Sequence, residues 1–245
     1  QQTFDEPLRL LADTMNMGES PACAGPDHYC KFDTVDLDLR LKHDEPPTLE
    51  GSLVDASKAA HALLAQYYEL GPEQAAFGHQ LTTEEWQQIG SIGQMENKVL
   101  STPPPVAVLT AYPLLSFIRE ELRTDLRRFT YLAGHRRNLA AVGAMLGIDE
   151  SEPLTDALEI LLPPGCKLML RKWRDPKGHF FVDLNLVYFS TSQMRELQLM
   201  DLSHPPRMRQ LYLKNLQHDY PEGLYPLEDV LDLMAASMRM LDQLK

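Results

Sequence analysis

Residues 134–138 are Gly-His-Arg-Arg-Asn, so one histidine and two arginines precede a residue type that favours helix N-termini. The run before them, FTYLAG (129–134), is rich in β-forming residues, and the run after them predicts a compact helix that ends at Gly147. Asn138 is predicted to cap that helix, whose free N–H groups and dipole favour a bound anion such as phosphate. The sequence therefore predicts a strand that carries His135 to a phosphate-binding helix terminus.

A structural role for His135 stays open on this pattern, because a single histidine at a strand end is often structural or faces solvent. A second candidate for a functional histidine is His43, which is followed by Asp44. That pair lies in a charged loop without a flanking strand and helix, so the pattern favours His135.

The composition is that of a globular protein and excludes several classes of partner. The chain has 245 residues, of which 44% are hydrophobic, enough for one large domain or two small ones. A net charge of −12 argues against binding to nucleic acid or to anionic membranes. No apolar run approaches the roughly 20 residues that span a bilayer. No signal peptide is recognisable at Gln1, so we expect the numbering to begin after processing or truncation.

Two of the three cysteines lie close together. Cys23 and Cys30 enclose a short loop rich in Gly, Pro and Asp, which favours a local disulfide, although free thiols stay open. A zinc site would need two further ligands, and His28 is the one candidate nearby, so no metal is expected. A disulfide would place the protein in the periplasm or outside the cell. Cys166 is predicted to be a small buried residue.

The pattern of elements changes near residue 104. Before that point we expect helices over 4–15, 53–71 and 82–100, the last opening with a capping box between Thr82 and Glu85. Gly90 and Gly93 either weaken this helix or mark close approach to another segment. The sequence therefore predicts a helical domain over residues 1–104.

Residues 105–245 are predicted to form a mixed α/β domain. A helix over 106–123 contains Pro113, so it should kink or start late. Strands over 165–173 and 179–190, joined by the turn RDPKG, predict an antiparallel hairpin. A further strand is expected over 208–213 and a terminal helix over 226–244. Trp86 and Trp173 are expected to be packing anchors, and Arg171 and Lys172 to straddle the sheet edge.

Three runs, 131–147, 162–173 and 180–197, resemble the C-terminal half of the histidine acid phosphatases, in the branch that contains bacterial phytases and glucose-1-phosphatase. That family has a Gly-His-Asp-x-Asn motif after a core strand, a Pro-x-Gly strand that ends in Trp, and a long strand that leads to a Gln-x-Arg helix. The corresponding positions here are 134–138, Pro164-Gly165 through Trp173, and 193–195. The helix at 111–118 and the first 100 residues are similar to the family's remaining helices, including a Cys-to-Cys loop that matches Cys23 and Cys30.

The resemblance implies an α/β fold in which a mixed sheet is flanked by helices (a phosphoglycerate-mutase-like core), with an additional helical domain. It also implies two-step hydrolysis of a phosphomonoester without a cofactor, in the periplasm or outside the cell, with a phosphorylated small molecule or inorganic phosphate as ligand. A histidine from an Arg-His-Gly-x-Arg-x-Pro motif attacks phosphorus. Arginines and a second histidine hold the phosphoryl oxygens, and an adjacent aspartate protonates the leaving group. On this resemblance His135, Arg137 and Asn138 form the phosphate-binding side of the site.

Two departures from the family pattern matter. None of the eight histidines is preceded by Arg and followed by Gly, so these 245 residues contain no nucleophile motif. The family places that motif on an N-terminal core strand, which we therefore expect to be absent. Arg136 occupies the position of the catalytic acid, and a guanidinium cannot donate its proton near neutral pH. The chain is expected to be part of a phosphatase, a non-catalytic anion-binding or interaction module, or a purely structural domain.

Overall fold

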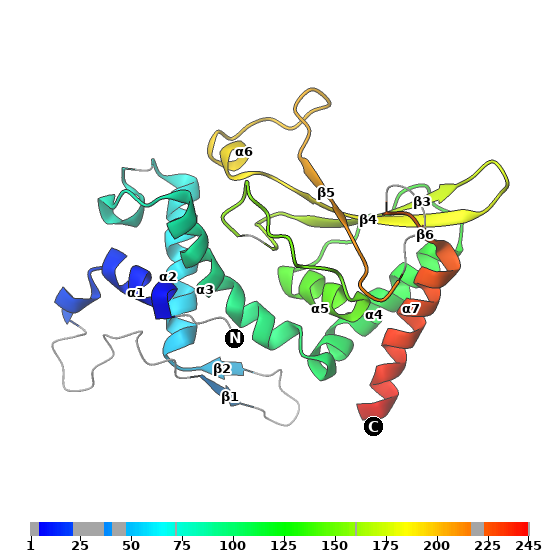
Figure 1. The fold of residues 1–245 in the computed structure, drawn as a ribbon, viewed down its shortest axis with the longest axis horizontal. Helices are drawn as coiled ribbons and strands as arrows, with labels where there is room; N and C mark the ends of the chain where they lie inside the picture. Colours follow the sequence, from blue (N-terminus) through cyan, green and yellow to red (C-terminus); the bar gives the residue numbers. More distant parts are fainter. Residues whose placement is uncertain are drawn as a thin grey trace. The chain divides into compact units, whose positions relative to one another are not determined.

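The computed structural model describes residues 5–21, 37–40, 48–71, 73–159, 161–216 and 223–244. They belong to two compact units (Figure 1). The first, called here the helical unit, comprises residues 1–100, 154–163 and 190–199, and the second, the α/β unit, comprises 101–153, 164–189 and 200–245. The sequence predicts a boundary at residue 104, and the first break between the two units lies between residues 100 and 101. Residues 154–163 and 190–199 join the helical unit through contacts with residues distant in the sequence.

The helical unit is built on amphipathic helices. Its elements are α1 (Asp5–Thr14), η1 (Met17–Glu19), α2 (Ser52–Glu69), η3 (Ala75–Gly78), α3 (Thr83–Ser101) and the short α6 (Thr191–Arg195), with an antiparallel pair of strands, β1 (Asp38–Arg40) and β2 (Thr48–Glu50). The apolar faces of α1, α2 and α3 meet in a core that fully buries Leu11, Leu64 and Ile89. The three predicted helices are therefore confirmed.

Local sequence signals set the start and the packing of α3. The backbone N–H of Thr82 donates to Glu85 Oε2 at 2.7 Å, and the N–H of Glu85 donates to Thr82 Oγ1 at 3.2 Å, as the predicted capping box requires. A Cβ added to Gly90 would lie 2.7 Å from the carbonyl oxygen of Leu158. One added to Gly93 would lie 2.9 Å from the His61 ring. Both glycines thus mark close approach, one of the two alternatives expected.

The α/β unit contains α4 (Pro104–Arg123), α5 (Arg136–Leu146), α7 (Leu227–Arg239) and η5 (Met240–Leu244), with strands β3 (Lys167–Arg174), β4 (Phe180–Tyr188), β5 (Arg207–Leu211) and β6 (Tyr225–Pro226). The strand order is β3-β4-β5, and β6 also pairs with β4. Among the described residues every one of these pairings is antiparallel. The hairpin predicted around RDPKG is confirmed, with Lys167 opposite Val187 and Arg174 opposite Phe180.

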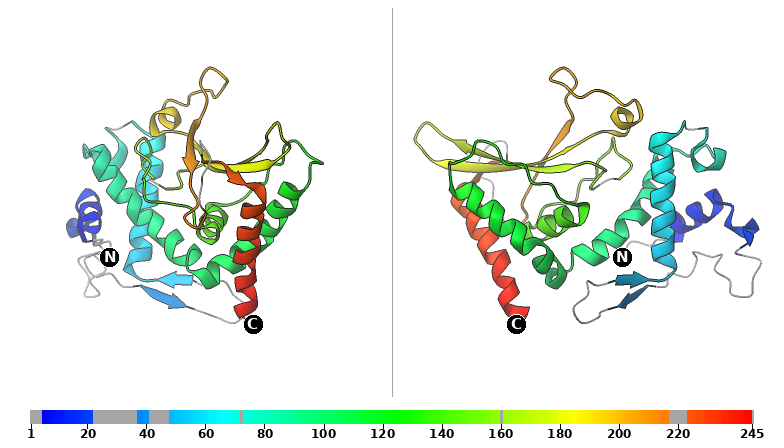
Figure 2. Two further views of the ribbon diagram at one scale, coloured as in Figure 1. Left: turned by 45° about the vertical axis from the view of Figure 1, so that its right-hand side comes forward. Right: turned by 180° about the vertical axis from the view of Figure 1, so that it is seen from behind.

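Helices α4, α5 and α7 lie on one side of this sheet (Figures 1 and 2). Alternate residues of β4, Val182 and Leu184, are fully buried against them, because successive side chains of a strand point to opposite faces. The hydroxyl of Tyr225 accepts a 2.8 Å hydrogen bond from the N–H of Leu213, and the hydroxyl of Ser237 donates to the carbonyl of Met145 at 2.7 Å. The sheet and its helices therefore share one core.

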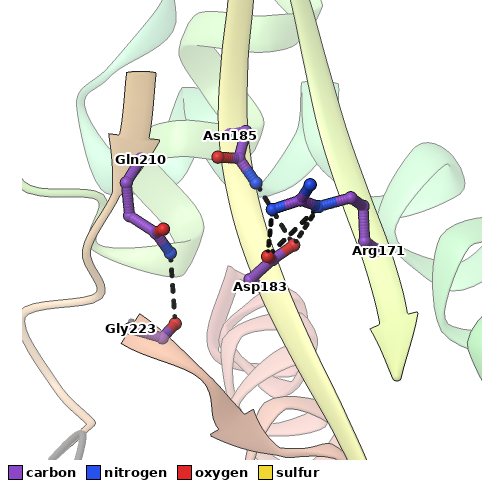
Figure 3. A network of polar contacts seen from close by, with 5 residues as sticks. All are labelled: Arg171, Asp183, Asn185, Gln210 and Gly223. Atoms are coloured by element: carbon purple, nitrogen blue, oxygen red, sulfur yellow. Dashed lines mark hydrogen bonds and ion pairs between the residues drawn. The ribbon is translucent and has the colours of Figure 1, made fainter. Parts of the chain in front are cut away.

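The opposite face of β4 carries a polar network (Figure 3). Arg171 Nε, from β3, donates to both carboxylate oxygens of Asp183 at 2.9 and 3.1 Å, and Asn185 Nδ2 donates to Asp183 Oδ1 at 3.2 Å. Asp183 is 3% exposed, and its carboxylate raises the pKa of the Arg171 guanidinium above its ordinary value. Lys172 reaches Asp125 instead, at 2.8 Å. Arg171 and Lys172 thus form specific ion pairs within the unit.

Three smaller expectations were wrong. Residues 129–134 form no strand, and they lie in a stretch, 123–135, in which every residue is exposed. The apolar pattern predicted a strand, but none of the described strands pairs with its backbone groups. Trp173 is 46% exposed, because it lies near the end of the hairpin, where Arg171 stacks on its ring at 5.1 Å. Cys166 is half-buried, and Trp86, at 3% exposed, is the packing anchor expected.

The α/β class with an additional helical part agrees with the sequence prediction. The strand pairings among the described residues are antiparallel. Within the same residues, no helix is both long enough and apolar enough to cross a membrane.

Candidate functional site

The junction between the exposed stretch and α5 brings His135, Arg137 and Asn138 into one helical turn. His135 is the N-cap residue, with extended backbone angles, and α5 begins at Arg136. Its Nδ1 atom accepts a long 3.4 Å hydrogen bond from the N–H of Arg137, and its own N–H donates to Asn138 Oδ1 at 3.0 Å. The pair forms a capping box in which a histidine takes the usual place of Ser or Thr.

The prediction that Asn138 caps α5 was wrong in position. Asn138 is the third residue of the helix, and its side chain reaches back to the backbone of the N-cap residue. The sequence signal for a helix start was sound, but a histidine is not among the preferred cap residues, so the pattern favoured Asn138.

The cap determines which nitrogen of the His135 ring faces outward. Because Nδ1 accepts from a backbone N–H, the proton of the neutral ring resides on Nε2. His135 is exposed, so this Nε2–H group is available to an acceptor in solution. A phosphoryl or sulfate oxygen is an acceptor of that kind.

The first turn of α5 carries two cations and no carboxylate. Arg136 and Arg137 are its first two residues, and no acidic residue accompanies them. Positive charge at a helix N-terminus is unfavourable, because the terminus already bears a partial positive charge. Nε of Arg137 is buried and makes no hydrogen bond to the described residues. The turn can therefore attract an anion through its electrostatic field.

The same turn lacks a proton donor for a leaving group. Arg136 occupies the position where the resemblance implies an aspartate, and a guanidinium does not serve as a general acid. His43, Asp44, Cys23 and Cys30 lie outside the described residues, so the alternative His-Asp pair and the predicted disulfide stay predictions.

The Gln-x-Arg segment has a structural role in the helical unit. Gln193 caps α6, because its Oε1 accepts from the N–H of Ser190 at 3.0 Å. The guanidinium of Arg195 lies 4.1 Å from the centre of the Tyr67 ring and donates to the Tyr67 carbonyl. These contacts attach segment 190–199 to α2.

Sequence reasoning missed the buried ionisable pair formed by Tyr68 and Glu159. The hydroxyl of Tyr68 donates to Glu159 Oε2 at 2.7 Å, and Glu159 is 2% exposed. Burial and the negative charge of Glu159 raise the pKa of Tyr68 well above its ordinary value. The two residues are 91 positions apart, so no local spacing could have indicated the contact.

The chain is similar in sequence and in fold to known phosphatases and phytases. No protein-family model matches the chain. It is 27% identical to a glucose-1-phosphatase of Providencia rettgeri over 93% of its own length, and 25% identical to phytase AppA of Escherichia coli over 90%. A solved structure of Hafnia alvei phytase in its apo form superposes with a TM-score of 0.84 at 24% identity, over 97% of this chain.

The chain spans only part of each of these proteins. It covers 55% of the glucose-1-phosphatase, 54% of AppA and 60% of the Hafnia alvei phytase. The shared fold supports the predicted α/β class, and the sequence matches extend over nearly the whole of the chain. By sequence and by fold, this chain is similar to glucose-1-phosphatases and phytases.

Proposed function

We propose that the chain is the part of a histidine acid phosphatase that binds the phosphoryl group from the second-histidine side, and that these residues alone do not hydrolyse phosphomonoesters. The relatives are a glucose-1-phosphatase and phytases, which supports a phosphorylated small molecule as the ligand. Inorganic phosphate would bind as the product of such a reaction. His135, Arg137 and Asn138 bind the anion, and Arg136 replaces the acid.

The observation that carries the proposal is the capping box at His135. It holds the imidazole at the N-terminus of α5 with Nε2–H directed away from the cap, in a first turn that carries Arg136 and Arg137. A phosphoryl oxygen placed there would accept from Nε2–H and would be attracted by the positive charge of that turn. Electrostatic stabilisation of the transferring group follows from the same arrangement.

Turnover needs two groups that these 245 residues do not supply. The sequence contains no Arg-His-Gly segment, so the covalent route through a phosphohistidine has no nucleophile. Loss of a general acid alone typically lowers a rate by a factor of about 10²–10⁴, which would leave measurable activity. The lack of a nucleophile is therefore the main reason why we expect these 245 residues to be inactive.

The alternative function is a non-catalytic anion-binding or interaction module. The observation that favours it is Arg136, because a second cation in the first turn strengthens anion binding while it removes the acid. Both functions predict phosphate binding by these residues, and they differ in whether polypeptide outside them supplies the nucleophile.

The test measures phosphate binding and hydrolysis of p-nitrophenyl phosphate by the 245-residue chain and three variants. We expect no turnover, phosphate binding in the millimolar range or weaker, and affinity about tenfold lower in Arg136→Asp. Arg9→Asp is the matched control, because Arg9 is exposed on α1 and the charge change is the same. His135→Ala should also weaken binding.

Two outcomes would contradict the proposal, and a third would distinguish the phosphatase from the non-catalytic anion-binding module. Steady turnover by the unmodified chain would refute it. Turnover restored in Arg136→Asp would reveal a nucleophile among the eight histidines. An upstream reading frame that encodes Arg-His-Gly supports the phosphatase, and an upstream frame without it supports the anion-binding module.

The periplasmic or extracellular location proposed for the chain rests on Cys23 and Cys30. A bridge between them requires an oxidising compartment. It would contribute roughly 2–3 kcal/mol in the chain-entropy picture, because the loop is short. Mass measurement before and after reduction should show a two-hydrogen difference in the peptide that contains both residues. Alkylation of both thiols without reductant would exclude the bridge.

A further inference from the structure

Residues 124–135, called here the connector, join α4 to α5 as exposed chain. Every residue of the connector is exposed, and Leu126 and Phe129 are 85% and 80% exposed. No N–H or carbonyl of residues 125–134 takes part in a backbone hydrogen bond within the described parts of the chain. Figures 1 and 2 show the connector as plain chain between the two helices. Exposed segments of this kind are preferred sites of proteolytic cleavage.

The connector carries two arginines whose backbone surroundings differ from those of the other basic residues. Of the described lysines and arginines, all but Arg127 and Arg128 lie in helices, in strands or in segments with backbone hydrogen bonds. Lys177, for example, lies in the turn where the N–H of Asp175 donates to the His179 carbonyl at 2.9 Å. A trypsin-like protease needs a basic side chain for its specificity pocket and an extended backbone that can pair with its own. The connector meets both requirements.

The two arginines differ in what holds their guanidinium groups. Arg127 pairs with Oε1 of Glu121, on α4, and Oε2 of the same carboxylate accepts from the hydroxyl of Thr130 at 2.6 Å. Arg128 makes no hydrogen bond or ion pair to the described residues. Arg128 can therefore enter a specificity pocket directly, whereas Arg127 must first leave Glu121.

We propose that the Arg128–Phe129 bond is a processing site for a serine protease of trypsin-like specificity. Hydrolysis breaks the C–N bond of this peptide and consumes one water, which leaves a carboxylate on Arg128 and an amino group on Phe129. The inference concerns cleavage of the chain, so it does not rest on the proposed phosphate binding.

The product of this cleavage should be a folded protein of two associated fragments. The first fragment, 1–128, retains α4, which packs through Leu115 into the core that it shares with α5 and α7 of the second fragment. In the helical unit, the hydrogen bond from Tyr68 to Glu159 also joins the two fragments. Cleavage of the connector interrupts none of these contacts.

The experiment follows limited proteolysis of the 245-residue chain by trypsin, with each fragment identified by its intact mass. Fragments 1–128 and 129–245 should form about tenfold faster than any pair produced by a cut elsewhere in the described residues. Lys31 and Lys42 lie outside those residues, so cuts after them are counted separately.

Two variants test whether Arg128 is the residue that the protease recognises. Arg128→Gln should slow cleavage of the connector about tenfold, because the remaining cut after Arg127 requires its ion pair to open. Arg174→Gln is the matched control and should leave the rate unchanged. Arg174 is also exposed, but it lies in β3 opposite Phe180 of β4, so its backbone is paired.

A second pair of variants tests the ion pair of Arg127. Glu121→Gln should raise cleavage after Arg127 several-fold relative to cleavage after Arg128, because the Arg127 guanidinium loses its counter-charge. Glu120→Gln is the control, because Glu120 pairs with Arg123 at 3.2 Å and with neither arginine of the connector. It should leave the ratio of the two cuts unchanged.

Three results would overturn the proposal. Cleavage of the connector no faster than cleavage in β3 or in the helices would show that its backbone is not accessible to a protease. A rate that rises with urea in parallel with unfolding of the chain would show that the cut requires unfolding. Fragments that separate on size-exclusion chromatography without denaturant would contradict the two-fragment product. None of these readouts uses phosphate binding or turnover, so failure of the proposed function would leave them unaffected.

Discussion

Tyr68 and Glu159 join two segments of the helical unit that lie far apart in the chain. The phenol of Tyr68, on α2, donates a 2.7 Å hydrogen bond to the carboxylate of Glu159, which is 2% exposed. Nearby, Gln87 Nε2 donates to the carbonyl of Ala157 at 3.1 Å. These contacts hold residues 154–163 against α2 and α3. Removal of the hydrogen bond between Tyr68 and Glu159 therefore tests how much this attachment contributes to stability.

Replacement of Tyr68 by Phe should destabilise the protein by about 1–3 kcal/mol, because a buried carboxylate loses a donor while the aromatic ring is retained. Tyr67→Phe is the matched control. Tyr67 is half-buried beside it, its ring packs 4.5 Å from the Trp86 ring, and its hydroxyl makes no hydrogen bond to the described residues. Its effect should stay within about 0.5 kcal/mol. Urea unfolding measures both, and equal losses would contradict the role assigned to the Tyr68 hydroxyl.

The raised pKa of Tyr68 predicts a loss of stability at alkaline pH. Burial, and then the charge of Glu159, keep the phenol protonated in the folded state, while in the unfolded chain it ionises near its ordinary value of about 10. The contribution is therefore complete below about pH 10 and is lost as pH rises above that value, by about 1.4 kcal/mol per pH unit. The free energy of unfolding between pH 8 and 11.5 should fall less steeply in Tyr68→Phe. Parallel curves would contradict this prediction.

Two helical glycines should respond in opposite directions to substitution by alanine. Gly90→Ala should destabilise by more than about 1 kcal/mol, because the new Cβ would lie 2.7 Å from the Leu158 carbonyl oxygen and backbone cannot easily move away. Gly143, inside α5, would place its Cβ 3.8 Å from Ile148, an ordinary contact. Gly143→Ala should therefore stabilise by roughly 0.5–1 kcal/mol through helix propensity. Thermal unfolding of the two variants measures both changes in stability. If the two substitutions changed the stability in the same direction, the packing assigned to Gly90 would be contradicted.

Substitutions of Asn138 should separate helix capping from anion binding. Asn138→Ala removes the acceptor of the His135 N–H and should cost about 1 kcal/mol of stability. Asn138→Asp keeps an oxygen acceptor and adds a negative charge that the helix N-terminus favours, so stability should be retained. The same charge should weaken phosphate binding. A phosphate titration and urea unfolding on both variants test this, and undiminished binding by Asn138→Asp would show that the charge of this turn does not govern affinity.

The sequence by itself determined the elements whose signals are local. The apolar periodicity of α2 and α3, the capping box at Thr82, and the turn between β3 and β4 all depend on residues close together in the chain. Gly90 belongs with them in part, because a glycine inside a helix signals close approach without identifying the partner. The motif around His135 likewise indicated a helix start, although the capping residue is His135 and not Asn138.

Tertiary structure decided what depends on partners distant in the chain. Residues 129–134 have strand propensity, yet a strand exists only when a neighbour satisfies its backbone, and no described segment does so. The contact of Tyr68 with Glu159, the return of residues 154–163 and 190–199 to the helical unit, and the pairing of Arg171 with Asp183 were equally beyond local patterns. Periodicity encodes which face of an element is apolar, but the segment that covers that face is chosen by packing in three dimensions.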